Sequence, residues 1–531
     1  MTPETSIYEY AKQGILLSPD KTAIWFYGNG ITYGRLFERI DRAAEQLRVL
    51  GVKQGTVVTI RLPNCPQTII AVYAVAKLGG ICNMVHALLP SESLKANMEF
   101  TDSSILITGN HIDDCGSIDF VKTLLYVDIS NDMGFINRLG YRLLNKNRRP
   151  NFCVPFEEYS PSCIKTGPEP KTLAECCGLY MHSSGSTGDP KTVMMSHTAL
   201  NNWVIKAKVY FADCDDSSHV CLSALPYFHA LGFEVDLHRV LSCGGTIVAM
   251  AKWDGKSAVR LIKKYGVNFM TAVPAMCRSL LNQKGFCGAK IMQLRSMFIG
   301  GEKMDPSLKL ELDSRLCSLD VPCAFDGYGL TETASACAVL TKEHYHVDSC
   351  GYPVYGVTFM VRHADGSLHP QGEGELVVGA NCLMMGYLND PSATAEAFVE
   401  WNGQRFLRTG DYGRIDEEGL IYFIERLKNT IVRKGNNIFP VEVENVIRRV
   451  NGVSEVCVIG LPDVGNDTQL VCACIVPKKG ANEAKLRRNI ETECKRALPP
   501  ISRPSRYVFL PDLPKTPIGK IDRRTLVRRL S

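Results

Sequence analysis

The chain has 531 residues, a length at which two or more domains are expected because one compact core seldom grows so large. Hydrophobic residues make up 45% and charged residues 22%, as in ordinary globular proteins, and a formal net charge of +5 is too small for a dedicated nucleic-acid binder. No run approaches the roughly 20 apolar residues of a membrane-spanning helix, and residues 1–6 lack the features of a secretory signal, so we expect a cytoplasmic protein.

Up to about residue 420, short apolar runs alternate with longer helical patterns. Residues 56–62 have the pattern of a buried strand, and residues 66–77 that of a helix with proline in its first turn. Further strands are expected at residues 104–108, 124–127, 245–250 and 268–273. This alternation predicts βαβ units, and hence an α/β fold with a largely parallel sheet and helices on both faces.

The last quarter of the chain has a different texture. Short strands with glycine-rich turns begin near residue 371 and indicate a small β-rich subdomain, and a basic segment follows. Residues 426–531 hold 21 basic and 10 acidic residues, whereas the remainder holds 39 and 45. Their pattern is strand-helix-strand-strand-helix, with a helix at 441–450 and strands at 453–461 and 469–477. We therefore predict domains over residues 1–425 and 426–531; charge alone leaves RNA, a membrane or a polyphosphate as the basic domain's ligand.

Two further features have ordinary structural explanations beside functional ones. The 21 cysteines are scattered and none has C-x-x-C spacing, so we expect small core residues in a reducing compartment and no metal site. Residues 133–149 place apolar side chains at helical spacing before a cationic end. This stretch is either a peripheral contact with an anionic membrane or a solvated surface helix packed on the main domain.

A loop rich in glycine and hydroxyl residues is the strongest local signal. An apolar run at residues 179–182 leads into Ser183, Ser184, Gly185, Ser186, Thr187 and Gly188, and Lys191 closes the loop. Glycines let backbone N–H groups turn toward an anion, hydroxyls add donors, and the lysine supplies a mobile charge for phosphate oxygens. Only two residues separate Gly185 from Gly188, so the spacing is not that of a P-loop kinase or ATPase.

This loop and a series of later motifs together resemble the adenylate-forming enzymes, which include acyl-CoA synthetases, 4-coumarate–CoA ligase-like enzymes, luciferases and peptide-synthetase adenylation domains. The motifs stand in family order at residues 225–229, 300–303, 326–333, 374–376, 386–389, 408–411, 425–428, 434–435 and 517–520. The resemblance implies a large N-terminal region of two α/β sheets with packed helices and a small β-rich subdomain. The resemblance also implies a small, mobile α+β C-terminal domain.

The resemblance assigns roles to individual residues. Lys520 matches the catalytic lysine that bridges the substrate carboxylate and the α-phosphate of ATP, Glu332 helps to hold Mg²⁺, and Thr331 contacts phosphate. Residues expected to bind the adenine and the rest of the nucleotide are Gly301, Glu302, Asp326, Gly327, Tyr328 and Gly329. Asp411 matches the aspartate that accepts both ribose hydroxyls, and Arg426 contacts the ribose from the C-terminal side.

The two half-reactions of the family use two orientations of the C-terminal domain. Lys428 falls at the hinge position, and rotation there would exchange Lys520 for Lys434 and Gly435, which lie near the thiol entry in the resembling enzymes. The sequence departs from the family at His182, Ser183 and Thr192, where Thr192 replaces a usual glycine. We expect altered packing of the phosphate loop, and the KM for ATP is the quantity that this change should affect most.

The substrate is expected to be a hydrophobic fatty or aryl acid. His229 stands where amino-acid-activating members usually carry an aspartate, and an imidazole is a poor partner for an ammonium group. Apolar residues at 230–233 and 271–276 also favour a hydrophobic pocket. Coenzyme A is the expected acceptor of the acyl group, and a carrier-protein thiol is the main alternative. A luciferase-like oxidation of the acyl-adenylate is the least favoured variant of the reaction. A non-catalytic nucleotide-binding protein is disfavoured by the presence of Lys520, Glu332 and Asp411.

Overall fold

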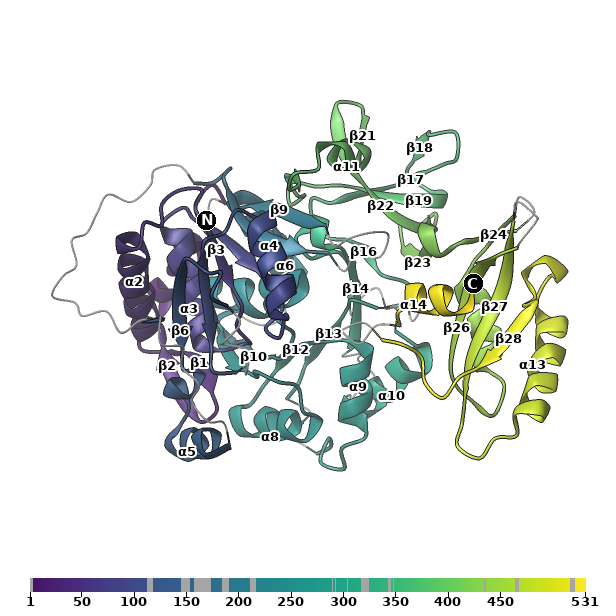
Figure 1. The fold of residues 1–531 in the computed structure, drawn as a ribbon, viewed down its shortest axis with the longest axis horizontal. Coiled ribbons are helices and arrows are strands. Elements are labelled where there is room, and N and C mark those ends of the chain that lie inside the picture. The colour runs from purple at the N-terminus through teal and green to yellow at the C-terminus, as the bar shows by residue number, and fades with distance from the viewer. Residues whose placement is uncertain are drawn as a thin grey trace. The chain divides into compact units, whose positions relative to one another are not determined.

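The structure is a computed structural model that describes residues 3–111, 118–144, 153–156, 173–183, 191–210, 216–288, 290–291, 293–302, 304–316, 324–341, 345–346, 348–433, 436–463, 468–515 and 521–531. The chain divides into two compact units (Figure 1). The first comprises Met1–Phe359 and Val378–Leu407, and the second Met360–Val377 and Arg408–Ser531. Each unit is described by itself. The predicted boundary between residues 425 and 426 falls inside the second unit, and it stays a prediction.

A nine-stranded sheet forms one half of the first unit. In spatial order its strands are β16 (Tyr352–Pro353), β15 (Ala336–Val339), β14 (Ala324–Gly329), β13 (Ser296–Ile299), β12 (Phe269–Ala272), β10 (Val220–Ser223), β11 (Thr246–Ala249), β1 (Thr22–Phe26) and β2 (Asn29–Thr32). All pairings from β14 through β1 are parallel, and the antiparallel strands stand at the two ends. Parallel pairing brings the carboxyl ends of these strands to one edge of the sheet.

An eight-stranded sheet forms the other half. Its order is β20 (Gly386–Tyr387), β9 (Thr192–Ser196), β8 (Cys177–His182), β4 (Ile81–Met84), β3 (Val57–Ile60), β5 (Ile105–Gly109), β6 (Thr123–Val127) and β7 (Val154–Pro155). The strands from β8 to β7 are parallel, whereas β8–β9 and β9–β20 are antiparallel. The five strands predicted at residues 56–62, 104–108, 124–127, 245–250 and 268–273 are thereby confirmed as β3, β5, β6, β11 and β12.

Helices separate and cover these sheets. They are α1 (Ile7–Leu17), α2 (Tyr33–Val49), α3 (Pro66–Lys77), α4 (Ser91–Phe100), α5 (Phe135–Leu144), α6 (His197–Tyr210), α7 (Arg239–Ser242), α8 (Gly255–Tyr265), α9 (Pro274–Leu281), α10 (Pro306–Leu316) and α11 (Pro391–Glu396), with a π-helical segment η5 (Gly232–His238) before α7. Helix α3 is buried from Pro66 to Ala76 and packs on β3, β4, α1 and α2. Its near-continuous apolar run reflects this burial, since a helix apolar on all sides needs neighbours on all sides.

A third sheet contains the segments at which the chain passes between the units. Its strands are β18 (Leu368–His369), β17 (Thr358–Arg362), β19 (Gly372–Gly379), β22 (Gln404–Ile415) and β21 (Phe398–Trp401), with β23 (Ile421–Arg426) paired to β22. The second unit continues through η7 (Leu427–Asn429), β24 (Ile431–Arg433), β25 (Asn436–Ile438), α12 (Pro440–Arg448), β26 (Val453–Pro462), β27 (Gln469–Pro477), α13 (Glu483–Ala497), β28 (Arg506–Phe509) and α14 (Arg523–Leu530). The predicted α/β class, with a large N-terminal and a small C-terminal part, is confirmed.

The cysteines in the described part of the chain are free thiols, and most are buried, as predicted for core residues. Burial raises the pKa of the Cys65 thiol to about 12, so this thiol stays protonated and inert. No group of three or more His, Cys, Asp or Glu side chains within the described ranges could hold a metal ion. Among the helices that the structure describes, none is long and apolar enough to cross a membrane.

One buried carboxylate ties three elements of the second unit together. Glu444 on α12 accepts hydrogen bonds from Val458 N on β26 and from the Arg523 guanidinium on α14, both at 2.8 Å. Replacing a buried partner leaves the other charge without compensation.

We predict that Glu444→Ala lowers the free energy of unfolding of the second unit by about 3–5 kcal/mol, as when a buried ion pair is broken. Glu491→Ala is the matched control: this carboxylate pairs with Arg487 on the exposed face of α13, where such pairs contribute about 0.2–1 kcal/mol. Urea titration of the full chain, followed by far-ultraviolet circular dichroism, measures both. Equal losses in the two variants would contradict the linking role of Glu444.

Candidate active site

The base of the predicted phosphate loop is a hairpin of the second sheet. Residues 184–190 lie outside the described residues, so the structure does not place Ser184, Gly185, Ser186, Thr187 or Gly188. Its two ends are described: Ser183 N donates to Lys191 O at 2.9 Å, and Lys191 N donates to the Ser183 hydroxyl at 3.2 Å. These bonds extend the antiparallel pairing of β8 and β9 by one step. The loop therefore begins and ends at a closed strand pair.

Two of the three expected departures from the family pattern, His182 and Thr192, are partners. His182 Nδ1 lies 3.0 Å from the Thr192 hydroxyl, and Nε2 lies 2.8 Å from Asn83 Oδ1. Because the amide oxygen only accepts, Nε2 carries the proton and Nδ1 accepts the hydrogen bond from Thr192. Burial lowers the pKa of His182 to about 4, so the ring is neutral at physiological pH.

Asn83 extends this contact into the core of the sheet. Its amide nitrogen donates to the Thr59 hydroxyl at 2.9 Å, to Asn97 Oδ1 at 2.8 Å and to the Thr101 hydroxyl at 3.2 Å. Asn83 lies on β4, which pairs with β8 directly beside the loop. The polar group is fully buried, and its hydrogen bonds offset the cost of that burial. The hairpin base is thus fixed to the sheet by a buried polar network.

A second connection runs from the end of the loop to the predicted magnesium ligand. The Lys191 ammonium lies 4.5 Å from the centroid of the Tyr387 ring, and the Tyr387 hydroxyl donates to Glu332 Oε1 at 2.9 Å. Strand β20 presents this tyrosine by pairing with β9, where Tyr387 stands opposite Val193. Burial and the neighbouring Glu332 carboxylate raise the pKa of the Tyr387 phenol. The phenol therefore stays protonated and donates.

Thr331 and Glu332 follow strand β14 in a single 3₁₀ turn, η6 (Thr331–Thr333). The Thr333 hydroxyl receives a hydrogen bond from Leu330 N at 3.0 Å and caps the turn. Gly329 comes so close to the returning strand that a Cβ there would meet Ser335 O at 2.0 Å. Only glycine fits this approach, and the sharp turn leaves Thr331 and Glu332 half-buried at the end of the strand.

The residues predicted to bind the nucleotide gather at the carboxyl ends of β13 and β14. Gly301 and Glu302 follow β13, and Asp326, Gly327 and Tyr328 lie on β14 itself. Gly301 has φ +83°, a backbone conformation that glycine adopts without strain. Ligands of open α/β sheets bind in this position, outside the carboxyl ends of parallel strands.

Asp326 is held by a buried cation. The Lys309 ammonium on α10 donates to Asp326 Oδ2 at 2.8 Å, and the lysine side chain is fully buried. The same ammonium lies 4.6 Å from the centroid of the Tyr345 ring. Asp326 thus fixes the end of β14 to the helix that covers it.

His229 lies in the loop after β10, at the same edge of the first sheet. The Phe228 ring contacts the rings of His229 and His86 in tilted arrangements, with centroid separations of 4.5 Å and 4.7 Å. Asn64 holds this loop from the neighbouring segment, accepting from Tyr227 N at 3.1 Å and donating to Leu225 O at 2.7 Å. The imidazole is therefore held by tilted ring contacts on a fixed loop.

The two candidate ribose ligands belong to the second unit and pair with each other. Asp411 on β22 is opposite Arg426 on β23, and Arg426 Nε lies 2.8 Å from Asp411 Oδ1. Asp411 N donates to the Thr409 hydroxyl at 3.1 Å, and that hydroxyl donates to Leu376 O at 2.7 Å. The aspartate is fully buried, so its orientation is fixed by the strands around it.

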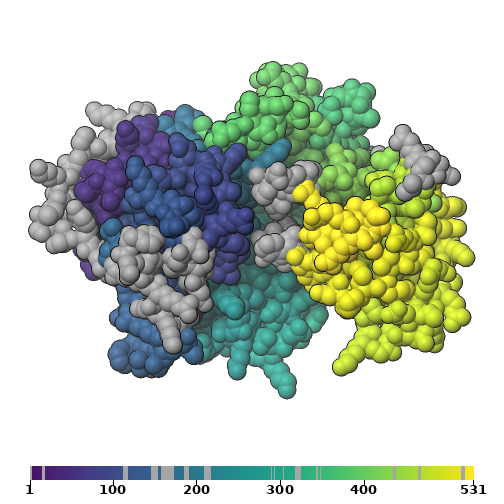
Figure 2. All heavy atoms as spheres, in the orientation of Figure 1, coloured from purple at the N-terminus to yellow at the C-terminus, as the bar shows by residue number. Residues whose placement is uncertain are grey.

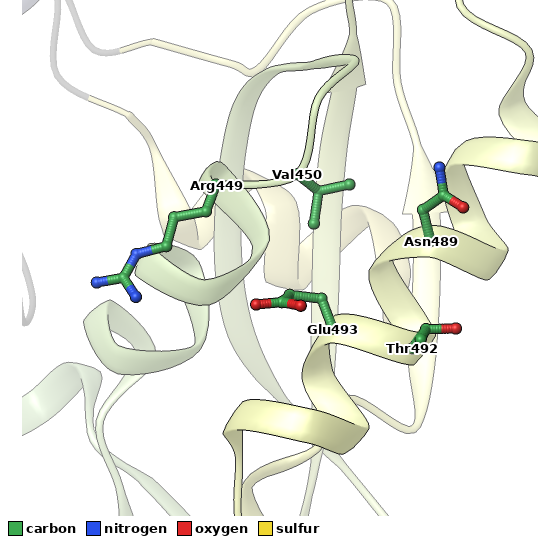
Figure 3. A pocket seen from close by; sticks show the side chains of 5 residues that line it. All are labelled: Arg449, Val450, Asn489, Thr492 and Glu493. Atoms are coloured by element: carbon green, nitrogen blue, oxygen red, sulfur yellow. The ribbon is translucent and has the colours of Figure 1, made fainter.

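Other predicted residues are placed only in part. Lys428 lies in η7, directly after β23, and its role as a hinge stays a prediction. Lys434, Gly435 and Lys520 lie outside the described residues. A hollow in the second unit, lined by Arg449, Val450, Asn489, Thr492 and Glu493 between α12 and α13, contains none of the candidate site residues (Figure 3).

Tyr387, Lys309 and Asn83 are among the residues of this arrangement that had no predicted role. Tyr387 stood inside a quoted motif, and Asn83 is a lone amide in a four-residue buried strand, which is itself a signal of a polar network. Lys309 gave no such signal, because a lysine on an amphipathic helix is ordinarily solvated.

The family of the chain follows from the sequence match across most of its length. Residues 15–388 match the AMP-binding enzyme family, and residues 442–520 match the AMP-binding enzyme C-terminal domain. The chain belongs to the AMP-binding enzyme family. The resemblance inferred from the ordered motifs is thereby confirmed.

Similar proteins of this family are named as ligases of acids and coenzyme A. The long-chain-fatty-acid–CoA ligase of Bacillus subtilis is 26% identical over 527 residues, covering 96% of this chain and 92% of that protein. A feruloyl-CoA synthase of Amycolatopsis is 29% identical over 452 residues, covering 84% of each. Each of these matches covers at least 84% of this chain and at least 84% of the relative.

A solved structure has the same fold. The o-succinylbenzoate CoA synthetase of Bacillus subtilis, in complex with an acyl-adenylate intermediate, superposes with a TM-score of 0.81 at 24% identity, covering 97% of each chain. The same enzyme in complex with ATP and magnesium ion also gives 0.81 at 24% identity, covering 98% of this chain and 99% of that one. At 24% identity, this structural similarity shows a shared fold and nothing more.

The residues of this AMP-binding enzyme also fit a magnesium–nucleotide complex. Mg²⁺ in nucleotide enzymes takes one or two protein carboxylates and completes its shell with phosphate oxygens and water. Glu332 is a half-buried carboxylate whose Oε1 is oriented by Tyr387, which matches that requirement.

We predict that His182→Ala and Thr192→Ala each raise the KM for ATP roughly two- to tenfold, the equivalent of one lost hydrogen bond. The double variant should be little worse than either single one, because both remove the same contact. Thr246→Ala is the control, since it removes a buried hydroxyl bond to Thr22 O in the other sheet and should leave this KM unchanged. Additive effects of the two substitutions would contradict the shared contact.

We predict that Tyr387→Phe raises the Mg²⁺ concentration needed for half-maximal ATP–pyrophosphate exchange about tenfold, the scale of a hydrogen bond to a charged group. The phenyl ring keeps its packing against Lys191 but no longer orients Glu332. Tyr355→Phe, at an exposed side chain of the same unit, is the matched control. An unchanged magnesium requirement in Tyr387→Phe would show that the Glu332 carboxylate is positioned by other contacts.

Proposed function

We propose that this AMP-binding enzyme is an ATP-dependent acid–thiol ligase. It adenylates a hydrophobic carboxylic acid with release of pyrophosphate and transfers the acyl group to coenzyme A. The observation that carries the proposal is the linked set Lys191–Tyr387–Glu332, which brings one cation from the phosphate loop and one carboxylate to the same tyrosine. The names of the similar ligases support the same reaction class.

In the first half-reaction a substrate carboxylate oxygen bonds to the α-phosphorus of ATP, and the bond from that phosphorus to pyrophosphate breaks. Negative charge is present on both sides of the reacting centre, so cations must lie there. We assign Lys520 to the carboxylate and α-phosphate, and Lys191 with the loop from Ser183 to Gly188 to the leaving phosphates. Bound Mg²⁺ would neutralise phosphate charge, with Glu332 as its protein ligand and Thr331 as a phosphate contact.

The nucleotide roles are proposed from the family resemblance, and the sheet edge of the first unit and the buried Asp411–Arg426 pair of the second support them. We assign the adenine frame to Gly301, Glu302 and Tyr328, with Asp326, Gly327 and Gly329 shaping the strand end. Asp411, held by Arg426, is assigned to the ribose hydroxyls, because a carboxylate offers two acceptor oxygens.

The acid is proposed to be fatty or aryl. A Cβ on Gly300 would meet Leu231 Cδ2 at 3.1 Å, and one on Gly301 would meet Val273 Cγ1 at 3.6 Å. Apolar side chains thus border the glycines that frame the nucleotide, and His229 stands where an ammonium-binding carboxylate would be expected. Such a border favours an apolar acyl group.

Transfer to the thiol is assigned to Lys434 and Gly435, with rotation at Lys428 between the half-reactions and His229 at the acyl site. In this step the thiol sulfur bonds to the acyl carbon and AMP leaves. We propose a cytoplasmic location for the enzyme, in which coenzyme A is the acceptor and a carrier-protein thiol is the alternative.

The central test is carboxylate-dependent ATP–pyrophosphate exchange across a panel of fatty, aryl and amino acids, followed by AMP release with coenzyme A or with a phosphopantetheinyl carrier protein. We expect exchange with apolar acids and thioester formation with coenzyme A. Folded protein without exchange on any acid would contradict the ligase function, and thioester formed only on the carrier would replace the acceptor.

We predict that Lys520→Ala abolishes pyrophosphate exchange yet still converts supplied acyl-AMP and coenzyme A to thioester and AMP. The reason is that we assign the lysine to the step in which the carboxylate attacks the α-phosphorus and pyrophosphate leaves. In the second half-reaction the bond from the acyl carbon to AMP breaks, and rotation at Lys428 has exchanged Lys520 for Lys434 and Gly435. Lys515→Ala, in the same segment and paired with Glu455 at 3.3 Å, is the control and should keep both half-reactions. Equal loss of both half-reactions in Lys520→Ala would contradict separate orientations.

A further inference from the structure

Helix α5 presents its apolar side chains to solvent. Phe135 is 81% exposed, Ile136 82%, Leu139 53% and Leu143 77%. At a helical spacing of 100° per residue these four side chains share one face, which we call the α5 apolar face. The helix stands at the margin of the first unit, beyond β1 and β2, and the space-filling view shows this segment as a protruding part of the surface (Figures 1 and 2).

The polar side of the same helix is the side that packs on the protein. Asn137 Nδ2 donates to Tyr27 O at 2.6 Å, and the Tyr141 hydroxyl donates to Asn110 O at 3.2 Å. Arg138 donates to Ser130 O at 3.2 Å, and Arg142 pairs with Asp128 at 3.1 Å. The helix is therefore inverted relative to an ordinary surface helix, which buries its apolar side.

These anchors hold the orientation of the helix. Gly134 begins the segment in close contact with the β1–β2 turn, where its N donates to Tyr27 O at 3.1 Å and an added Cβ would lie 3.2 Å from Gly28 C. Turning the apolar face inward would break the bonds of Asn137, Arg138 and Arg142 together. Exposed apolar patches that a fold maintains in this way usually mark an interaction surface.

The charge of the sequence that contains the helix favours one occupant. From Met133 to Phe156 the sequence holds five basic residues and no acidic residue. A second copy of the chain would bring the same positive charge against this surface, whereas an anionic bilayer complements it. Helices that lie in a membrane interface combine such an apolar face with flanking cations.

We propose that the α5 apolar face docks the enzyme on an anionic lipid bilayer, with Phe135, Ile136, Leu139 and Leu143 in contact with the acyl chains. The helix lies in the interface and spans nothing, since it has only ten residues. This inference goes beyond the ligase function and does not depend on it.

The test is co-sedimentation of the full chain with vesicles of phosphatidylcholine alone and of phosphatidylcholine with an equal amount of phosphatidylglycerol. We expect binding to the anionic vesicles that weakens with added salt, and loss of at least tenfold in affinity for the variant Phe135→Ser/Ile136→Ser/Leu143→Ser. Leu310→Ser removes an equally large apolar side chain, 56% exposed on α10, and should bind as the unmodified chain does. Because the replaced side chains are exposed, the thermal midpoint of the triple variant should be unchanged.

A direct readout comes from Ile136→Trp, whose fluorescence should shift to shorter wavelength with anionic vesicles and not with phosphatidylcholine. This single substitution serves if the triple variant does not fold. No binding of the folded chain to anionic vesicles, or equal binding by the triple variant, would overturn the proposal. A dimer in sedimentation velocity that the triple variant abolishes would assign the face to a second copy instead.

Discussion

The candidate site depends on one geometric constraint, the meeting of parallel strands at a common edge. Strands β10, β12, β13 and β14 are parallel neighbours, so the segments that leave their carboxyl ends emerge side by side. His229 and Tyr328, which are 99 positions apart in sequence, are brought to this edge by the pairing of these strands. Individual residues then shape the edge locally. Gly329 permits a tight turn, and Lys309 fixes Asp326.

A second constraint is the satisfaction of buried polar groups. The two described ends of the segment between β8 and β9 are fixed to the sheet, because His182 bonds to both Thr192 and Asn83. A glycine at position 192 would leave His182 Nδ1 without its donor. The expected departures from the family pattern at His182 and Thr192 therefore depend on each other.

The sequence predicted the fold class and seven of the strands, β3, β5, β6, β11, β12, β26 and β27, because apolar runs of β-type residues alternate with helices and leave little choice of period. The resemblance of the ordered motifs to the adenylate-forming enzymes also directed attention to residues that lie at this edge, among them Gly301, Glu302 and Tyr328. It did not predict the links among them. Tyr387 and Glu332 are 55 positions apart; the pairing of β20 with β9 and the hydrogen bond from Met384 N to Glu332 O bring the phenol to the carboxylate. The buried role of Lys309 was not predicted for the same reason. Its partner Asp326 lies on another element, and periodicity describes one element at a time.

Helix α5 shows a further limit of periodicity. The spacing of Phe135, Ile136, Leu139 and Leu143 defines two faces of a helix, but not which of them meets the protein. The usual assumption buries the apolar face, and in a helix with few polar contacts that assumption would hold. Here the polar face has better partners, because carbonyls of the 130–133 turn and the Asp128 carboxylate are oriented toward Arg138 and Arg142. Competition between these directed bonds and the undirected hydrophobic effect decides the orientation, and the outcome depends on residues outside the helix.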